Sequence, residues 1–248
     1  METLFREGEP MTKTISIYNF KGGVGKTSLS FLLGNYLAMK GKKVLLIDSD
    51  PQSSLTKSFK KLEGNTVYDL LSENAKIQDC IQEVNDNLSL VPGSFKTLKI
   101  HNNVLQEFIK ENLKGLKFDY CLIDTSPTLN NLVVSCLTAS NLILIPSLIS
   151  GYDLNETLFI LSRIKEINPG AKTKVILNRT QKASGEFTKL ENDYREALKV
   201  NGHLLQSSIP NTNLVKKFID LKENPFTGKT KAKIAFTELF QAITKEIK

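Results

Sequence analysis

The sequence predicts one doubly wound α/β domain, in which helices cover both faces of a mostly parallel β-sheet. Apolar runs of strand length alternate with segments of helical periodicity to the end of the chain. Several of these runs are continuously apolar, as in strands that are buried on both faces of a parallel sheet. The length of 248 residues, with 40% hydrophobic and 24% charged residues, suits a soluble globular domain.

The elements follow one another in a regular order. The strand-like runs lie at 13–20, 43–50, 86–93, 118–126, 141–147, 173–179 and near 206–210. Helical patterns lie between and after them, at 27–41, 98–113, 129–139, 153–167, 186–200, 213–222 and 230–247. We expect the domain over 13–248, after a loose extension over 1–12, with its ligand site at the carboxyl ends of the strands.

A glycine-rich segment, "KGGVGKTS" at 21–28, joins the first strand to the first helix. It departs from the usual G-x-x-x-x-G-K-[ST] phosphate loop because Phe20 stands in place of the first glycine. Unpaired backbone N–H groups at a helix N-terminus favour a bound phosphate. We therefore expect a P-loop NTPase-like site, in which Lys26 reaches the outer phosphates and Thr27 ligates Mg²⁺. The loop residues are Lys21, Gly22, Gly23, Val24, Gly25, Lys26, Thr27 and Ser28.

Acidic residues stand at the ends of two strands: Asp48 and Asp50 after one, and Asp124 at the end of another. There a carboxylate can hold Mg²⁺, directly or through water. It can also orient or deprotonate a water that attacks the γ-phosphate. The alternative is that some of them only cap the segment that follows, as Asp often does.

Asn178 ends a late strand, where it can contact a nucleotide base. Guanine sites of this loop class usually carry an Asp three residues later, but this chain has Gln181. Gln181 lacks the carboxylate that would accept the N1 and N2 protons of guanine. The sequence therefore favours ATP.

The composition argues against several classes of protein. No apolar run approaches the about 18 residues of a membrane span, and the first dozen residues lack the layout of a secretion signal. The 3 cysteines form no C-x-x-C pair, which favours a reducing cytoplasm, and the presence of only 2 histidines argues against a dedicated transition-metal site. The net charge is +7, carried almost wholly by lysine, which suits phosphate contacts better than base reading.

Together these motifs resemble the ParA branch of the deviant-Walker ATPases, in the ParA/MinD/nitrogenase-iron-protein superfamily. The matching pieces are "KGGVGKTS", "VLLIDSDPQSSLT", "FDYCLIDTSPTLNNL", "LILIPS…YDLNETLFIL", "LNR" and "SSIPNTN". The resemblance implies that Lys21 reaches across an ATP-bound homodimer to the partner's phosphates, and that Gly22 lets the two loops approach.

The resemblance also implies roles around the nucleotide. Asp50 positions or activates the hydrolytic water, while Asp48 and Asp124 serve the Mg²⁺ shell to which Thr27 is a direct ligand. Asn178, with the neighbouring Arg179 and the backbone around Pro210, frames the adenine. The catalytic set is Lys21, Lys26 and Asp50.

The implied function is a partition ATPase of the cytoplasm and nucleoid, without a membrane. It would bind DNA nonspecifically and segregate a plasmid, chromosome or phage replicon, and a ParB-type centromere-binding partner would stimulate its weak hydrolysis. Asn211 replaces an arginine that DNA-binding members often carry after "IP". The expected substitutes are Lys216, Lys217, Lys222, Lys229, Lys231 and Lys233.

Three alternatives remain open. A MinD-like membrane switch would use the apolar face of the terminal helix (Phe236, Leu239, Phe240, Ile243 and Ile247), which otherwise packs on the sheet. A metal-cluster protein like the nitrogenase iron protein would need more cysteines than Cys136 to supply four thiolates across a dimer. A small-molecule ligase on the same fold is disfavoured by Lys21 and by "DPQ" at 50–52.

Overall fold

The computed structural model describes residues 12–60, 62–149, 153–180, 186–200, 202–212, 214–222, 226 and 231–247. In these parts of the chain, eight strands form one sheet in the order β3-β4-β2-β5-β1-β6-β7-β8. Only β3 and β4 pair antiparallel, and every other pair is parallel. The predicted doubly wound fold is confirmed.

The strands are β1 (Lys13–Ile17), β2 (Val44–Asp48), β3 (Gln82–Asn85), β4 (Leu88–Val91), β5 (Tyr120–Asp124), β6 (Leu142–Ser147), β7 (Lys172–Thr180) and β8 (Ile209–Pro210). The α-helices are α1 (Lys26–Met39), α2 (Ser54–Lys57), α3 (Val67–Leu71), α4 (Ile77–Cys80), α5 (Phe108–Leu113), α6 (Asn131–Thr138), α7 (Asp153–Ile167), α8 (Glu186–Val200), α9 (Leu214–Leu221) and α10 (Lys231–Glu246). Two 3₁₀ turns precede α5, η1 (Phe95–Lys99) and η2 (His101–Asn103).

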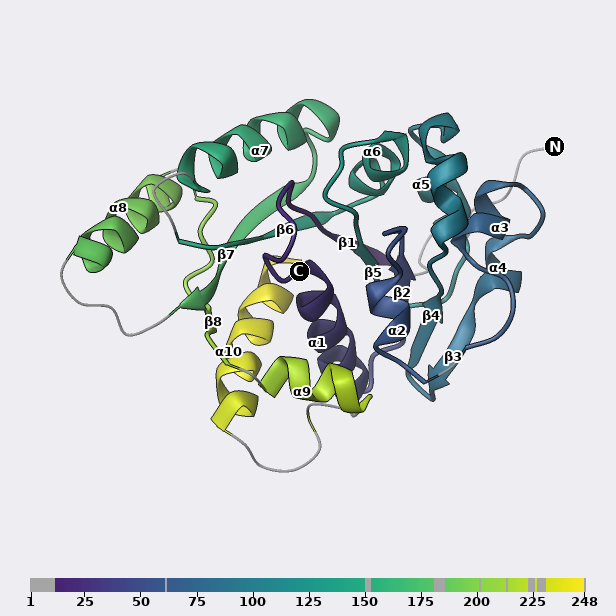
Figure 1. Ribbon diagram of the computed structural model, residues 1–248, viewed down its shortest axis with the longest axis horizontal. Helices are drawn as coiled ribbons and strands as arrows, with labels where there is room; N and C mark the ends of the chain where they lie inside the picture. Colours follow the sequence, from purple (N-terminus) through teal and green to yellow (C-terminus); the bar gives the residue numbers. More distant parts are fainter. Residues whose placement is uncertain are drawn as a thin grey trace.

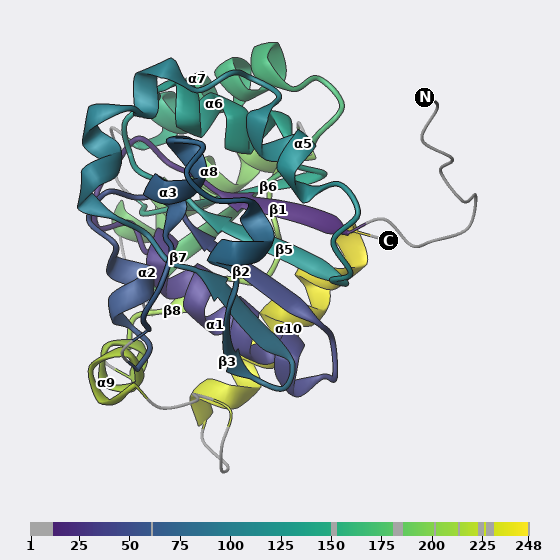
Figure 2. The ribbon, with the colours of Figure 1, turned by 90° about the vertical axis from the view of Figure 1, so that its right-hand side faces the viewer.

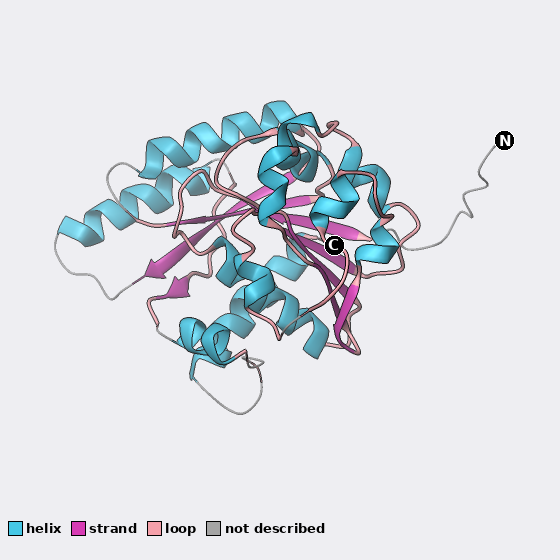
Figure 3. Ribbon diagram, turned by 45° about the vertical axis from the view of Figure 1, so that its right-hand side comes forward, coloured by secondary structure: helices cyan, strands magenta, loops and turns pink. Residues whose placement is uncertain are grey.

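Helices cover both faces of the sheet (Figures 1 and 3). The helices α1, α9 and α10 lie on one face, and α5 to α8 lie on the other. Successive residues of a buried strand point to opposite faces of the sheet. Leu46 packs in the same core cluster as residues of α1 and α10, whereas Leu45 and Ile47 pack with residues of α3 to α6. This explains why β2 is buried at every position and apolar up to Asp48 at its carboxyl end, since both of its faces are covered.

The register of the sheet brings the acidic strand ends together. Asp124 of β5 lies opposite Asp48 of β2 on one side and Ile17 of β1 on the other. Because the loop that follows β1 starts at this same edge, both carboxylates end beside the glycine-rich loop. β1 lies between β5 and β6, near the middle of the sheet.

Three sequence expectations need correction. The single helix expected over 98–113 is η1, η2 and the short α5, and Asn102 and Asn103 fall in the second turn. Asn side chains compete with the helix for backbone hydrogen bonds, which shortens helices at such positions. The strand expected near 206–210 contains only Ile209–Pro210, which pair with Asn178 and Thr180 of β7. The edge strand β3 and helices α2, α3 and α4 were not predicted.

The terminal helix packs its apolar face on the sheet. This is the alternative to the MinD-like membrane switch, in which the same face would enter a membrane. Phe236, Leu239, Phe240 and Ile243 are at most 2% exposed and belong to the same core cluster as α1. The end of α10 reaches the start of β1, where Lys13 Nζ donates to the Ile247 carbonyl at 3.1 Å (Figure 2). The face that would enter a membrane is therefore buried inside the fold. None of the described helices has the length and apolar character needed to cross a bilayer.

The extension expected over 1–12 falls almost wholly outside the described residues, which begin at Thr12. The Thr12 hydroxyl donates to the carbonyls of Leu116 and Phe118. Thr12 is thus already attached to the domain.

Candidate nucleotide-binding site

The glycine-rich loop connects β1 to α1 as the sequence predicts. Gly25 is the N-cap of α1 and has a φ of +99°, a conformation that favours glycine. A Cβ on Gly25 would also lie 2.3 Å from Nδ2 of Asn178, so the close approach of β7 excludes a side chain there. Asn178 Nδ2 donates to the Val24 carbonyl at 2.7 Å. The predicted base-contact residue therefore also holds the loop in place.

Lys26 lies inside this loop. Its ammonium donates to the carbonyls of Asn19 (3.2 Å) and Lys21 (2.9 Å), and the residue is 7% exposed. Burial lowers its pKa, while the charges of Asp124 and Asp50 oppose that shift. A phosphate in the loop would add negative charge beside this buried ammonium and offset the cost of its burial, which suits the predicted role of Lys26.

Asn19 is a structural residue of the loop that the sequence argument missed. It is 3% exposed; its Nδ2 donates to the Pro146 carbonyl at the end of β6, and its Oδ1 accepts from the Lys21 N–H. Asn19 thus anchors the first half of the loop to the neighbouring strand. Its position directly before an aromatic and a lysine gave no local signal of this contact.

Thr27 and Asp124 come together as predicted for the magnesium shell. The Thr27 hydroxyl donates to Asp124 Oδ2 at 2.7 Å, and the Ser30 hydroxyl donates to Oδ1 at 3.0 Å. Thr27 and Ser30 share a helix face because they are three residues apart. Burial, together with the nearby Asp48 charge, raises the pKa of Asp124. A divalent cation beside this buried carboxylate would stabilise its charged form.

The structure gives Asp48 a further partner, Thr56. Asp48 Oδ2 accepts from both the N–H (2.8 Å) and the hydroxyl (2.7 Å) of Thr56, and Oδ1 accepts from the Asp50 N–H at 3.3 Å. Thr56 Oγ1 in turn accepts from the Gly93 N–H at 2.8 Å. Gly93 packs so closely that a Cβ there would lie 2.9 Å from Asp48 Cγ. Asp48 therefore fixes the segment after β2 whether or not it also serves the magnesium shell.

Asp50 follows β2 and turns the chain toward α2. Its Oδ1 accepts from the Gln52 N–H at 2.9 Å, and its carbonyl accepts from the Ser53 N–H at 2.8 Å. This contact closes a local turn rather than capping α2, whose N-cap is Ser53. The predicted role with water remains a prediction.

Lys21 and Gly22 lie at the open edge of the loop. Lys21 Nζ forms an ion pair of 2.6 Å with Glu156 Oε2 of α7, and the two side chains are 38% and 49% exposed. A Cβ added to Gly22 would meet nothing within 4 Å, and Gly22 has no positive φ. No described contact within this one chain explains a glycine at that position.

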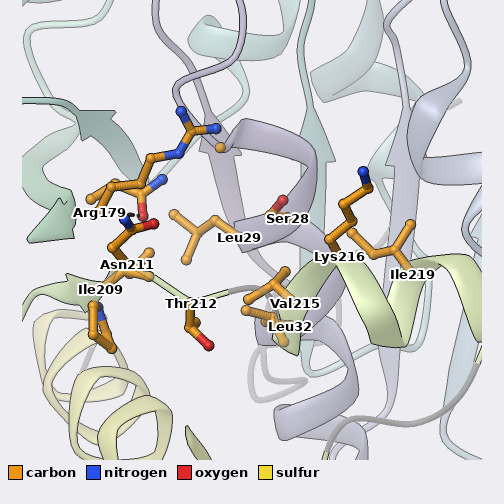
Figure 4. Close-up of a pocket in the computed structure, with 13 residues that line it drawn as sticks. Ser28, Leu29, Leu32, Arg179, Ile209, Asn211, Thr212, Val215, Lys216 and Ile219 are labelled. Atoms are coloured by element: carbon orange, nitrogen blue, oxygen red, sulfur yellow. Dashed lines mark hydrogen bonds between the residues drawn. The ribbon is translucent and has the colours of Figure 1, made fainter.

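A pocket of about 480 Å³ opens beside the loop, between α1, α9 and the ends of β7 and β8 (Figure 4). Arg179 has a left-handed backbone, φ +55°, and its side chain reaches over the pocket. The three residues predicted to frame adenine all line it. Its walls are formed by Gly25, Ser28, Leu29, Leu32, Asn178, Arg179, Ile209, Pro210, Asn211, Thr212, Val215, Lys216 and Ile219.

Three of the six lysines expected to contact DNA have side chains that the structure describes. Lys216, Lys217 and Lys222 are exposed on or just after α9, and Lys216 also lines the pocket. Lys229 lies outside the described residues. Lys231 and Lys233 belong to α10, but their side chains fall outside what the structure describes.

The described residues give no support for a cysteine-held metal cluster or a metal site built only from side chains. Cys80, Cys121 and Cys136 are fully buried, and Cys136 Sγ lies 3.7 Å from the Ser49 hydroxyl. Among the described residues, no group of three His, Cys, Asp or Glu side chains is placed to hold a metal. A magnesium ion here would therefore depend on Thr27, Asp124 and the phosphates of the nucleotide, as is usual for this ion.

Comparison with known proteins places the chain among nucleotide-dependent partition proteins. The family model described as an AAA domain matches residues 12–178. The chain is 35% identical over 171 residues to the chromosome-partitioning ATPase Soj of Treponema pallidum (strain Nichols), which covers 66% of this chain and 68% of that protein.

Two solved structures extend the likeness over nearly the whole chain. A putative plasmid partition protein from Borrelia burgdorferi B31, bound to AMPPNP, is 27% identical with a TM-score of 0.82, over 95% of this chain and 99% of that one. The septum site-determining protein MinD of Pyrococcus horikoshii OT3, complexed with Mg-ADP, is 25% identical with a TM-score of 0.81, over 95% of this chain and 97% of that one.

Proposed function

This chain belongs to the ParA/Soj-type partition ATPases of the MinD/ParA superfamily, and from that premise we propose that it is an ATP-dependent dimerising switch that binds DNA nonspecifically and segregates a replicon. The observation that carries the proposal is the edge of the phosphate loop, where Lys21 and an unconstrained Gly22 face outward. A ParB-type protein bound to the centromere is the proposed partner, and it would stimulate a hydrolysis that is weak without it.

ATP with Mg²⁺ is the proposed ligand of the loop and its pocket. Lys26 would contact the outer phosphates, Thr27 would ligate Mg²⁺, and Asp124 would hold Thr27 in place through the hydrogen bond described above. Asn178, Arg179 and Pro210 would surround the adenine. Catalysis then consists of positioning and charge neutralisation at the γ-phosphate, with Asp50 placing the attacking water.

Nucleotide-dependent dimerisation follows from the exposed edge of the loop. In an ATP dimer, Lys21 of each chain would meet the negative charge of the partner's phosphates, and Gly22 would leave room for the two loops. Hydrolysis removes that charge and releases the dimer, which is a population shift driven by the ligand. The proposal predicts that Gly22→Val preserves folding and ATP binding but prevents dimerisation, because a Cβ there meets nothing within 4 Å in the monomer.

DNA binding is proposed for the lysine-rich surface of the C-terminal part, with Lys216, Lys217 and Lys222 as its described members. Lysine contacts phosphate as a point charge, so such a surface would bind DNA of any sequence. Dimerisation would double the surface. Nonspecific DNA binding should therefore require ATP and keep the protein on the nucleoid.

The decisive experiment is binding to a random-sequence duplex with ATP, ADP or no nucleotide, across a salt series. We expect binding with ATP alone, with a log–log slope of about −0.9 for each phosphate neutralised. Gly22→Val serves as the control that binds ATP without dimerising. Binding that ignores the nucleotide, or an absence of binding with ATP at low salt, would refute the proposed switch.

A further inference from the structure

The two adjacent lysines of α9 lie in different surroundings. Val215, Lys216 and Ile219 line the nucleotide pocket, whereas the exposed Lys217 is not among the described residues that line it. Consecutive helix residues differ in direction by about 100°, since a turn takes about 3.6 residues. One lysine of the pair therefore faces the pocket, and the next faces elsewhere.

The pocket carries positive charge that none of its described lining residues neutralises. Arg179 and Lys216 line it from opposite sides, and none of the described residues that line it is acidic. Neither the Arg179 guanidinium nor the Lys216 ammonium has an ion-pair partner among the described residues. Figure 4 shows Lys216 extending from α9 toward the level of Ser28, with Arg179 on the far wall.

The position of Ser28 indicates which part of a bound nucleotide would lie near the Lys216 ammonium. Gly25 and Ser28 lie at the N-terminal turn of α1, where phosphate binds, and both line the pocket. A nucleotide whose base lies beside Asn178 and Pro210 therefore enters the loop by way of Ser28. The first phosphate along that path is the α-phosphate.

We infer that Lys216 is a nucleotide-binding residue whose ammonium pairs with the α-phosphate of the bound nucleotide. This inference rests on the proposed function, because it takes the pocket as the nucleotide site. It separates Lys216 from Lys217 and Lys222, which remain the described members of the proposed DNA surface. Helix α9 then contacts the nucleotide on one side and DNA on the other, so that it links the two ligands.

The test compares Lys216→Ala with Lys217→Ala, the matched exposed lysine next to it. The affinity of each full-length protein for mant-AMPPNP with Mg²⁺ is measured by fluorescence titration at low and high salt. For a solvent-exposed charge pair we expect Lys216→Ala to weaken binding about threefold to fivefold at low salt and less at high salt. Lys216→Arg should stay within about twofold of the wild type, since it keeps the charge, and so should Lys217→Ala.

Two further measurements separate the possible roles of Lys216. Adenosine, which has no phosphate, should compete equally well in the wild type and in Lys216→Ala. At saturating AMPPNP, Lys216→Ala should bind a random duplex nearly as the wild type does, whereas Lys217→Ala should bind it more weakly.

The inference is overturned by any of three results. These are an unchanged AMPPNP affinity in Lys216→Ala, an equal loss of adenosine affinity, or a loss of DNA binding at saturating AMPPNP without a loss of nucleotide affinity. A wild-type protein that fails to bind AMPPNP would instead refute the proposed function itself, so the two failures are distinguishable.

Discussion

The ion pair between Lys21 and Glu156 predicts that the monomer restrains its own dimerisation. Lys21 must leave Glu156 before it can reach a partner's phosphates, so each chain of the dimer gives up one pair. Glu156→Gln removes the charge that holds Lys21 and keeps nearly the same side-chain volume. The variant should therefore dimerise more tightly in the presence of AMPPNP.

The size of the effect follows from the exposure of the pair. With side chains 38% and 49% exposed, solvent screens the attraction, and such surface pairs contribute about 0.3–1 kcal/mol each. Two pairs per dimer correspond to about 0.6–2 kcal/mol, which is roughly a threefold to thirtyfold lower dissociation constant. The difference should shrink at about 0.5 M salt, where the Debye length falls below about 5 Å.

Sedimentation of the wild type and the variant with AMPPNP, over a range of protein concentrations, measures this constant directly. Glu166→Gln is the control, because Glu166 forms an exposed ion pair with Arg163 on the same helix but is not paired with Lys21. The control should leave the constant unchanged. A Glu156→Gln dimer that is equal to or weaker than the wild-type dimer at low salt would refute the reasoning, and would assign Glu156 a role within the dimer.

Three further predictions concern the acidic turn and the core. Asp50→Asn keeps the oxygen that accepts from the Gln52 N–H but removes the charge. The variant should fold normally, hydrolyse ATP more slowly and remain on DNA with ATP. Hydrolysis at the wild-type rate would contradict a role of Asp50 in placing the attacking water. Thr56→Val loses its hydrogen bonds to Asp48 and Gly93 and should lower the free energy of unfolding by about 1–3 kcal/mol in urea, whereas Thr56→Ser should lose much less. Burial raises the pKa of all three thiols, that of Cys80 to about 11. At pH 8 Ellman's reagent should therefore label none of them until guanidinium unfolds the chain. Rapid labelling of the native protein would contradict this and would show that the core opens.

The local sequence was enough to predict the loop, the strand that precedes it and the alternation of strands and helices. A helix N-terminus binds phosphate through its own backbone, so "KGGVGKTS" between a strand and a helix predicts the site without any distant contact. Parallel strands expose their carboxyl ends at one edge, so Asp48 and Asp124 could be placed near the loop from their positions alone. The broken helix over 98–113 was missed because Asn102 and Asn103, which fall in the second 3₁₀ turn, look like ordinary polar positions.

Only the tertiary structure decided which side chains meet. The pairing of Asn178 with Gly25 and Val24, of Thr56 with Asp48, and of Glu156 with Lys21 joins different elements, and no periodicity in the sequence indicates it. The same holds for Lys216 and Lys217, which are identical in type and adjacent in sequence but differ in what they face. The physical reason is that periodicity reports how each element buries its own apolar face, whereas the partners of a polar side chain depend on how the elements pack against one another.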